Sequence, residues 1–271
     1  MTDRSAGLLA TSGLAFARLS RIACAAGDAA MRYYGRPILA ERKDDGSPVT
    51  AADRSAHGVI VDALHAWTPD VAVVSEEGVL PSPDDAARLD PFWLVDPLDG
   101  TKEFVAHNGE FTVNIALLDG GVPVLGVVYA PVPRLLYIAA EGRGAWRRRR
   151  GQAARRIYSR RWRPGMPARI VESRSHRSAA LERYLGGLRV ALRTAVGSSL
   201  KFCLVAEGRA DLYPRFVPAM EWDVAAGDCV FRNSGVDAPR RSPIRYGQPG
   251  FRLPGGFVIG DDDLGAAVDA A

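Results

Sequence analysis

Asp96-Pro97-Leu98-Asp99-Gly100-Thr101 is the stretch around which the rest of the chain is organised. It follows the apolar run Phe92-Trp93-Leu94-Val95, which predicts a short buried strand. The proline fixes one φ angle, and the glycine allows a backbone conformation that other residues avoid. The turn can therefore direct both aspartates into one small volume. Two carboxylates that close repel each other unless a shared proton, a basic side chain or a metal ion neutralises them.

A cation site is one of two interpretations of this turn. Oxygen ligands favour a hard cation, usually Mg²⁺, whereas the Asp99-Gly100 pair alone also fits an ordinary turn. A second apolar run, Val71 to Ser75, predicts another strand, and this strand ends at Glu76 and Glu77. Adjacent side chains alternate in direction, so one of these acids can face the site while the other supports it. Two consecutive strands that end in acids favour a shared cation site.

The rest of the chain alternates helical and strand patterns, and it contains no internal repeat. Apolar spacing predicts a helix from Leu14 to Tyr34. Thr50 is a suitable N-cap for a helix that runs to about Trp67, with Asp53 in its first turn. A hairpin and a third strand predict an antiparallel sheet. The further predicted elements are strands at 112–118, 122–130, 135–140, 169–171, 190–192, 211–213 and 257–259, and helices at 178–185, 200–207, 221–235 and from 261.

Length and composition are those of a globular chain. Its 271 residues, 47% of them hydrophobic and 24% charged, suffice for one large domain or two lobes. The three cysteines have no metal-binding spacing, so we expect a reducing compartment and a cytoplasmic location. We expect no signal peptide and no segment that crosses a membrane.

Arginines carry much of the formal net charge of +4. Arg147 to Arg150 form an unbroken run, and five more arginines follow between 155 and 163. Such a cluster can attract anionic substrates, lipid headgroups or nucleic acid. It can equally be a solvated, partly mobile loop. Both interpretations stay open at this point.

Four motifs, in this order, resemble the inositol monophosphatase superfamily of Mg²⁺-dependent, lithium-sensitive phosphatases. They are 47–53 (SPVTAAD), 75–77 (SEE), 96–104 (DPLDGTKEF) and 222–223 (WD). Within it the chain is most similar to bacterial 3'(2'),5'-bisphosphate nucleotidases, through 102–104, 110–116, 197–208 and 213–215. Those enzymes remove the 3'-phosphate of adenosine 3',5'-bisphosphate, a by-product of sulfate assimilation, to give AMP. The resemblance extends roughly from Leu14 to Ile259.

This resemblance implies an α+β fold, a layered αβαβα sandwich with two lobes and the metal site between them. Residues 1–165 would form an N-terminal α+β lobe with the metal-binding motifs. Residues 166–271 would form a C-terminal α/β lobe with substrate-binding residues and the last metal ligand. The chain departs from close relatives at Glu221, where they often have an apolar residue, and an extra acid there is expected to alter the rim of the site. The run Arg147 to Arg150 is a second departure.

The resemblance also implies the site residues. Two or three Mg²⁺ ions are expected, with Glu77 in an outer position or beside a third, weaker ion. Thr101 would orient the attacking water, and Asp53 would draw its proton through Thr101. The implied metal ligands are Glu76, Glu77, Asp96, Leu98 through its carbonyl, Asp99 and Asp223. The implied substrate-binding residues are Gly100, Thr101, His176, Ser198, Lys201 and Arg215.

We therefore expect a phosphatase whose partner is a small nucleotide bisphosphate. The nearest alternative is an inositol monophosphatase or a related sugar-phosphate phosphatase with the same metals and another pocket. An alternative of another class is a basic protein that binds nucleic acid or a membrane surface through its arginines. That alternative leaves the ordered carboxylates unexplained, so no nucleic-acid partner is expected. Weak attachment to the cytoplasmic face of the inner membrane is compatible with the enzyme, and the oligomeric state is left open.

Overall fold

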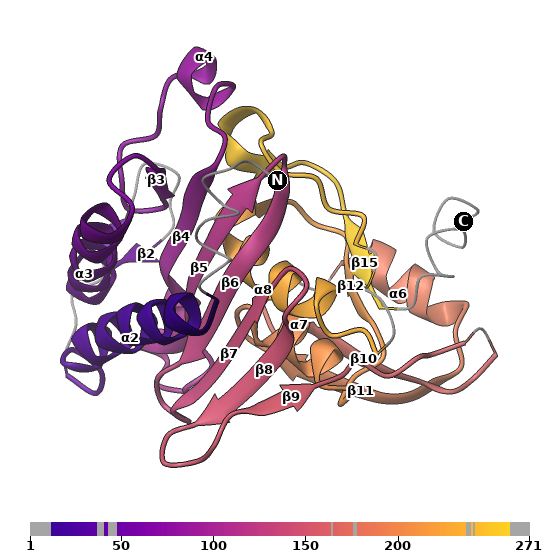
Figure 1. Cartoon of the computed structure of the whole chain (residues 1–271). Coiled ribbons are helices and arrows are strands. Elements are labelled where there is room, and N and C mark those ends of the chain that lie inside the picture. Colours follow the sequence, from indigo (N-terminus) through magenta and orange to yellow (C-terminus); the bar gives the residue numbers. More distant parts are fainter. Residues whose placement is uncertain are drawn as a thin grey trace.

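The structure is a computed structural model that describes residues 12–36, 41–42, 48–163, 165–175, 178–236, 240 and 242–260. A seven-stranded sheet lies at its centre, with helices on both faces and the small sheets of the C-terminal half beyond the second helical layer (Figure 1). These layers confirm the predicted α+β sandwich. None of the described helices has the length and apolar character needed to cross a membrane.

The first helical layer consists of α2 (Ser12–Met31) and α3 (Ala51–Trp67), which pack on one face of the sheet (Figure 1). Leu19 of α2 and Ile60 of α3 are fully buried there, as the helical spacing of apolar residues predicts. Thr50 caps α3, because its Oγ1 accepts a hydrogen bond from the backbone N of Ala52 at 3.1 Å. The predicted cap is therefore confirmed.

The central sheet has the strand order β3-β4-β5-β6-β7-β8-β9. Its neighbouring strands are antiparallel except β3 and β4, which run parallel. Helices cover both faces, so β4 to β7 are almost entirely buried and their sequences are nearly continuous apolar runs. The strands are β3 (Ala72–Ser75), β4 (Phe92–Asp99), β5 (Thr112–Asp119), β6 (Val122–Ala130), β7 (Leu135–Ala140), β8 (Gly144–Arg149) and β9 (Arg155–Ile157).

The arginine-rich segment extends this sheet, which the sequence did not predict. The run from Arg147 lies largely in β8, and β9 pairs with β8 at the sheet edge. Arg147 Nε lies 3.3 Å from Oε2 of the buried Glu207. The segment is therefore not a loop, although Arg148 to Arg150 are exposed to solvent, as the solvated interpretation expected.

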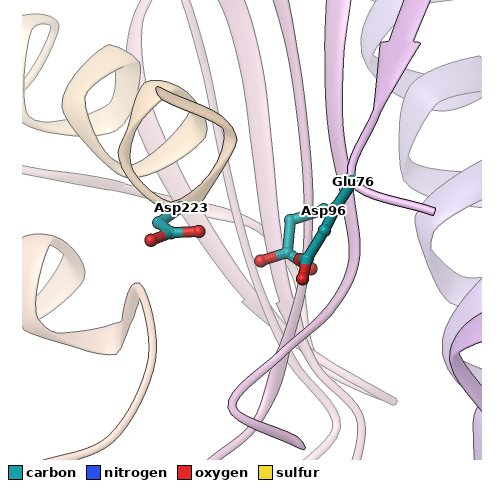
Figure 2. Close-up of side chains that lie close together, drawn as sticks. All are labelled: Glu76, Asp96 and Asp223. Atoms are coloured by element: carbon teal, nitrogen blue, oxygen red, sulfur yellow. The ribbon is translucent and has the colours of Figure 1, made fainter. Parts of the chain in front are cut away.

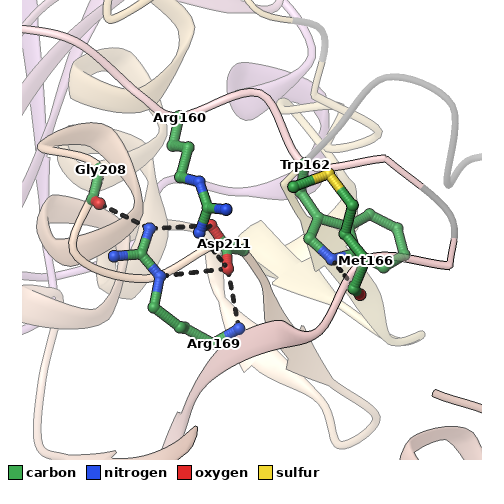
Figure 3. A network of polar contacts seen from close by, with 6 residues as sticks. All are labelled: Arg160, Trp162, Met166, Arg169, Gly208 and Asp211. Carbon is green, nitrogen blue, oxygen red and sulfur yellow. Dashed lines mark hydrogen bonds and ion pairs between the residues drawn. The ribbon is translucent and has the colours of Figure 1, made fainter. Parts of the chain in front are cut away.

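The same segment is tied to the second half of the chain through Asp211, whose side chain is fully buried (Figure 3). Both oxygens of Asp211 accept hydrogen bonds from Arg160, each at 3.3 Å. Arg169 donates to the same carboxylate through its backbone N at 2.8 Å and its Nη2 at 2.9 Å, and also to the carbonyl of Gly208 at 2.8 Å. Removing Asp211 would leave the partly exposed guanidinium groups of Arg160 and Arg169 without this shared partner.

The C-terminal half supplies the second helical layer and the small sheets. Helix α8 packs on the sheet face opposite α2, and α7 packs beside it (Figure 1). Strands β10 and β11 pair in parallel and are connected through α6. The elements are β10 (Ala168–Ser173), α6 (Ala179–Gly186), β11 (Val190–Val196), α7 (Leu200–Ala206), β12 (Tyr213–Arg215), β13 (Ala219–Met220), α8 (Glu221–Arg232), η1 (Pro249–Phe251), β14 (Arg252–Leu253) and β15 (Phe257–Ile259).

Element boundaries differ from the predictions at a few places. The strand predicted at 211–213 is shifted to β12, and α8 ends at Arg232, short of the predicted 235. The predicted helix from 261 lies outside the described residues. The short elements β1 (Glu41–Arg42), β2 (Pro48–Val49), α4 (Pro83–Ala86) and α5 (Thr101–Val105) complete the chain. The division into lobes 1–165 and 166–271 stays a prediction.

Candidate functional site

Strand pairing brings the first two acids together. Ser75 lies opposite Val95 in the parallel pair β3–β4, and the backbone N of Glu76 donates to the carbonyl of Val95 at 3.1 Å. Because parallel strands end at the same edge of a sheet, Glu76 and Asp96 emerge side by side. Asp223 reaches them from the first turn of α8 (Figure 2). Ligand oxygens of these three acids all lie within 4.8 Å of one another.

A cavity of about 250 Å³ opens beside these acids, and we call it the metal cavity. It contains five of the six predicted metal ligands and five of the six predicted substrate-binding residues, so the structure gathers most of the expected site. Its lining residues are Glu76, Asp96, Leu98, Asp99, Gly100, Thr101, Lys102, Glu103, Ser173, Ser175, Gly197, Ser198, Ser199, Lys201, Phe202, Tyr213, Arg215, Asp223 and Val224.

Burial and mutual repulsion make the acids of the metal cavity costly to ionise. Burial, reinforced by the charges of Glu76, Asp99 and Asp223, raises the pKa of Asp96 well above its usual value. Burial and the charges of Asp99 and Glu76 raise the pKa of Asp223 to about 7, although Arg215 opposes the shift. Such a group of carboxylates needs a cation to be ionised together. Its donors are all oxygens, so the residues fit a hard divalent ion such as Mg²⁺.

Asp99 is held by two residues that lie within the motifs 110–116 and 197–208 but were not predicted as site residues. Its Oδ2 accepts hydrogen bonds from the backbone N of Ser199 at 2.6 Å and from Nδ2 of Asn114 at 3.1 Å. The hydroxyl of Ser199 accepts from Asn114 at 2.9 Å and donates to the backbone carbonyl of Asp223 at 2.5 Å. This network fixes Asp99, on the central sheet, relative to Asp223 on α8. An Asn inside the apolar run 112–118 was the available signal, because a buried amide requires partners.

The predicted water-activating pair is in contact. Thr101 Oγ1 donates to Asp53 Oδ1 at 3.2 Å, and Oδ2 of Asp53 accepts from the backbone N and the hydroxyl of Thr50 at 2.8 and 2.6 Å. Burial raises the pKa of Asp53, and the charge of Glu77 adds to the increase. Gly100 precedes Thr101 with φ +94°, a conformation that favours glycine.

Glu77 does not line the metal cavity. Its charge raises the pKa of Asp53. Burial lowers the pKa of His57, and the charge of Glu77 opposes that change. Both residues belong to α3, so Glu77 lies toward this helix. Nδ1 of His57 is 2.9 Å from the hydroxyl of Ser75, which anchors the end of β3 to α3. A role for Glu77 beside a third ion stays a prediction.

Lys201 and Arg215 line the metal cavity but already bind the backbone. The buried ammonium of Lys201 donates to the carbonyl of Ser198 and lies 3.4 Å from that of Val196. Arg215 donates to the carbonyls of Val217 at 3.2 Å and Pro218 at 2.8 Å. Both residues therefore shape the walls of the cavity as well as its charge.

Ser198 is the predicted substrate contact with the clearest unmet hydrogen-bonding capacity. Its φ is +52°, and its Oγ is buried without a hydrogen-bond partner among the described residues. A buried hydroxyl of this kind gains from a ligand that completes it. His176, the remaining predicted substrate contact, lies outside the described residues.

Glu221 does not lie at the rim of the site, so that expectation was wrong. Its side chain is buried, and its oxygens accept hydrogen bonds from the backbone N of Gly247 at 3.0 Å and of Gln248 at 2.7 Å. It precedes Asp223 by two positions on α8, which corresponds to a rotation of about 200° around the helix axis. The two acids therefore point to opposite sides of α8.

Three comparisons with known proteins place the chain among phosphatases. A profile of the "Inositol monophosphatase family" matches residues 15–253. The chain is 49% identical over 246 residues to the 3'(2'),5'-bisphosphate nucleotidase CysQ of Escherichia coli K12, covering 87% of this chain and 98% of that protein. It is 30% identical to CysQ of Haemophilus influenzae, covering 90% and 91%.

Solved structures agree with these sequence matches. The crystal structure of CysQ from Bacteroides thetaiotaomicron superposes with a TM-score of 0.71 at 38% identity, covering 88% of this chain and 94% of that chain. The IMPase of Thermotoga maritima superposes with a TM-score of 0.74 at 24% identity, covering 95% of each chain, and shows the likeness of fold.

Proposed function

Because the chain belongs to the inositol monophosphatase family, we propose that it is a Mg²⁺-dependent 3'(2'),5'-bisphosphate nucleotidase. The substrate is adenosine 3',5'-bisphosphate, and the products are AMP and phosphate. The observation that carries this proposal is the convergence of Glu76, Asp96 and Asp223 beside the hydrogen-bonded pair Thr101–Asp53. The names of the curated relatives support a 3'(2'),5'-bisphosphate nucleotide as the substrate class, and the resemblance noted in the sequence supports adenine as its base. Three free cysteines, two of them buried, support a cytoplasmic location.

We infer that two or three Mg²⁺ ions bind in the metal cavity. Glu76, Asp96 and the carbonyl of Leu98 would hold one ion, and Asp99 and Asp223 would hold another together with Asp96. Bound ions supply a water of lowered pKa and stabilise the charge that develops on the phosphoryl oxygens. Ionisation of the acids is coupled to binding, because the cation offsets the repulsion that raises their pKa values.

Thr101 and Asp53 handle the proton of the attacking water in this proposal. Since the Thr101 hydroxyl donates to Asp53 Oδ1, its oxygen is oriented to accept a hydrogen bond from water. As the water attacks phosphorus, its proton passes to Thr101 Oγ1 and the Thr101 proton passes to Asp53. Burial raises the pKa of Asp53, which makes this carboxylate a better base than an exposed one.

The phosphate ends of the substrate need separate partners. The backbone N–H groups of Gly100 and Thr101 would bind the 3'-phosphate beside the metal ions. Ser198 would donate its buried hydroxyl to the nucleotide, and Lys201 and Arg215 would supply positive charge toward the 5'-phosphate. His176 is proposed to join them on the basis of the sequence alone.

A phosphate-release assay tests this function. Turnover of adenosine 3',5'-bisphosphate and inositol 1-phosphate would be compared with Mg²⁺, with EDTA and with added Li⁺. The proposal predicts a large preference for the nucleotide, loss of activity with EDTA and inhibition by Li⁺. A large preference for inositol phosphate would replace it with the inositol phosphatase alternative. Full activity of Asp96→Asn in the presence of chelator would refute the metal-dependent mechanism altogether.

A further inference from the structure

A second cavity, of about 380 Å³, lies between α2 and strands β6, β7 and β8 of the central sheet, and we call it the arginine cavity. It shares no lining residue with the metal cavity. Helix α2 contributes one wall, and strands β6, β7 and β8 with the turns before β7 and after β8 contribute the other. Its lining residues are Ser20, Arg21, Cys24, Asp28, Tyr129, Arg134, Leu136, Arg148, Arg150, Gly151 and Gln152.

The arginine run of β8 reaches this cavity through strand alternation. Arg147 lies opposite Tyr137 and contacts Glu207 on the α7 side of the sheet. Arg148 lies opposite Leu136, and both face the arginine cavity on the α2 side. Because successive side chains of a strand point to opposite faces, the run is divided between two environments. Arg147 is paired with an acid, whereas Arg148 and Arg150 line the cavity.

Positive charge dominates the arginine cavity. Four guanidinium groups line it, from Arg21, Arg134, Arg148 and Arg150, against the single carboxylate of Asp28. None of the four forms an ion pair with an acid in the part of the chain that the structure describes. Like charges gathered around a partly enclosed volume raise its potential, and an anion that enters relieves the repulsion.

The backbone holds these arginines at the cavity. The N–H of Arg150 donates to the carbonyl of Arg134 at 3.0 Å, so the turns before β7 and after β8 are joined. Tyr129 and Leu136 add an aromatic and an aliphatic wall between the charges. Planar guanidinium groups match the oxygens of a phosphate, and the apolar wall suits an organic body. The volume falls in the range of small-molecule sites.

We propose that the arginine cavity binds a phosphorylated small molecule at a site separate from the catalytic one. Arg134, Arg148 and Arg150 hold the phosphate, and Tyr129 and Leu136 contact the rest of the ligand. A phospholipid headgroup offers the same phosphate chemistry. A recess walled by a helix and a sheet fits a free ligand better than a flat bilayer surface, so the free molecule is the expected occupant.

The alkylation rate of the Cys24 thiol can report whether a ligand occupies the arginine cavity. It lines the arginine cavity and is half-buried, whereas Cys203 and Cys229 are fully buried. N-ethylmaleimide, a neutral reagent, should therefore alkylate Cys24 first in the folded protein, which Cys24→Ser would verify by mass spectrometry. Inorganic phosphate and pyrophosphate serve as probes in buffer free of Mg²⁺. We expect pyrophosphate to slow alkylation of Cys24 saturably, by about fivefold or more, while sodium chloride of equal ionic strength does not.

Matched variants decide whether the arginines cause the protection. Arg134→Gln/Arg150→Gln removes two guanidinium groups and keeps Arg148 beside the thiol, so protection should disappear. Arg149→Gln, on the same strand but absent from the cavity lining, should retain it. Equal protection in all three proteins, or none in the wild type, would overturn the proposal. Protection by phosphatidylglycerol vesicles without protection by pyrophosphate would overturn the free-ligand assignment.

The test is independent of the proposed catalytic function. Hydrolysis of adenosine 3',5'-bisphosphate does not enter the alkylation measurement, and the substituted arginines do not line the metal cavity. The double variant should keep wild-type thermal stability and basal turnover. A chain that fails as a nucleotidase can still show protection of Cys24, and the reverse also holds.

Discussion

Without metal, the protein should lose stability as the pH rises, and Asp223→Asn should suppress this loss. The pKa of Asp223 is raised from 3.8 to about 7, mainly by burial and by the charges of Asp99 and Glu76. Between these two values the folded state holds a proton that the unfolded state has released. The free energy of unfolding therefore falls as the pH rises, by at most about 1.4 kcal/mol per pH unit for one group. Asparagine keeps an oxygen that can accept the hydrogen bond which Met220 N now donates at 3.2 Å.

The expected size of the effect follows from this slope. From about pH 5 to pH 7, Asp223 alone removes about 2 kcal/mol, because the carboxyl is already half ionised at pH 7, and this corresponds to roughly 4–9 °C in Tm for a chain of this size. Added Mg²⁺ should reverse the trend at pH 7, because the ion binds the ionised carboxylates of the folded state. Asp223→Asn should show a flatter profile and a much smaller gain from Mg²⁺.

Thermal unfolding followed by circular dichroism, in EDTA and in Mg²⁺ across this pH range, measures both effects. Asp84→Asn, which removes an exposed acid of α4, is the control and should behave as the wild type does. The reasoning fails if metal-free wild type gains stability with pH. It also fails if Mg²⁺ stabilises Asp223→Asn as much as the wild type.

Substitutions at three further positions distinguish a residue that takes part in the reaction from residues that stabilise the structure. Thr101→Val should lower kcat by about 10²–10⁴ because the path to Asp53 is lost, and Thr101→Ser should restore most of it in a steady-state assay. Ser199→Ala leaves Asn114 with one partner fewer, so urea unfolding should show a loss of about 1–3 kcal/mol and calorimetry a weaker Mg²⁺ affinity. Glu221→Leu should lower the free energy of unfolding by a similar amount, about 1–3 kcal/mol, and leave KM unchanged. A raised KM would show that Glu221 acts at the rim of the site after all.

Strand-end carboxylates made much of the site predictable from sequence. One predicted buried strand ends at Glu76 and the next ends at Asp96. The two acids meet only if these strands are neighbours in the sheet. Because the strands are consecutive in the chain, this was the expected arrangement, and the pairing of β3 with β4 confirms it. Thr50 was recognisable as a cap because capping chemistry is local. Asp223 required the resemblance to a family, since nothing near α8 indicates what it faces.

The missed residues act over long sequence separations. Asn114 and Ser199 lie 85 residues apart and meet only because α7 packs against the sheet. The strands β8 and β9 were missed because a segment rich in arginine is typical of a solvent-exposed loop. Four identical residues in a row also show no alternation of apolar and polar side chains, which is the usual sequence signal of a strand. Glu221 was misplaced because its direction depends on the rotation of a helix rather than on its distance from Asp223.

The parallel pairing of β3 with β4 also makes this enzyme suitable for protein engineering. Four residue pairs set its register, from Ala72 opposite Phe92 to Ser75 opposite Val95, and the intervening connection contributes none of them. Within that connection, Val79 is fully exposed. A reporter peptide or a fluorophore attached there should leave the alignment of Glu76 with Asp96 intact. Position 79 is thus a natural point for grafting a sensor a short distance from a working catalytic centre.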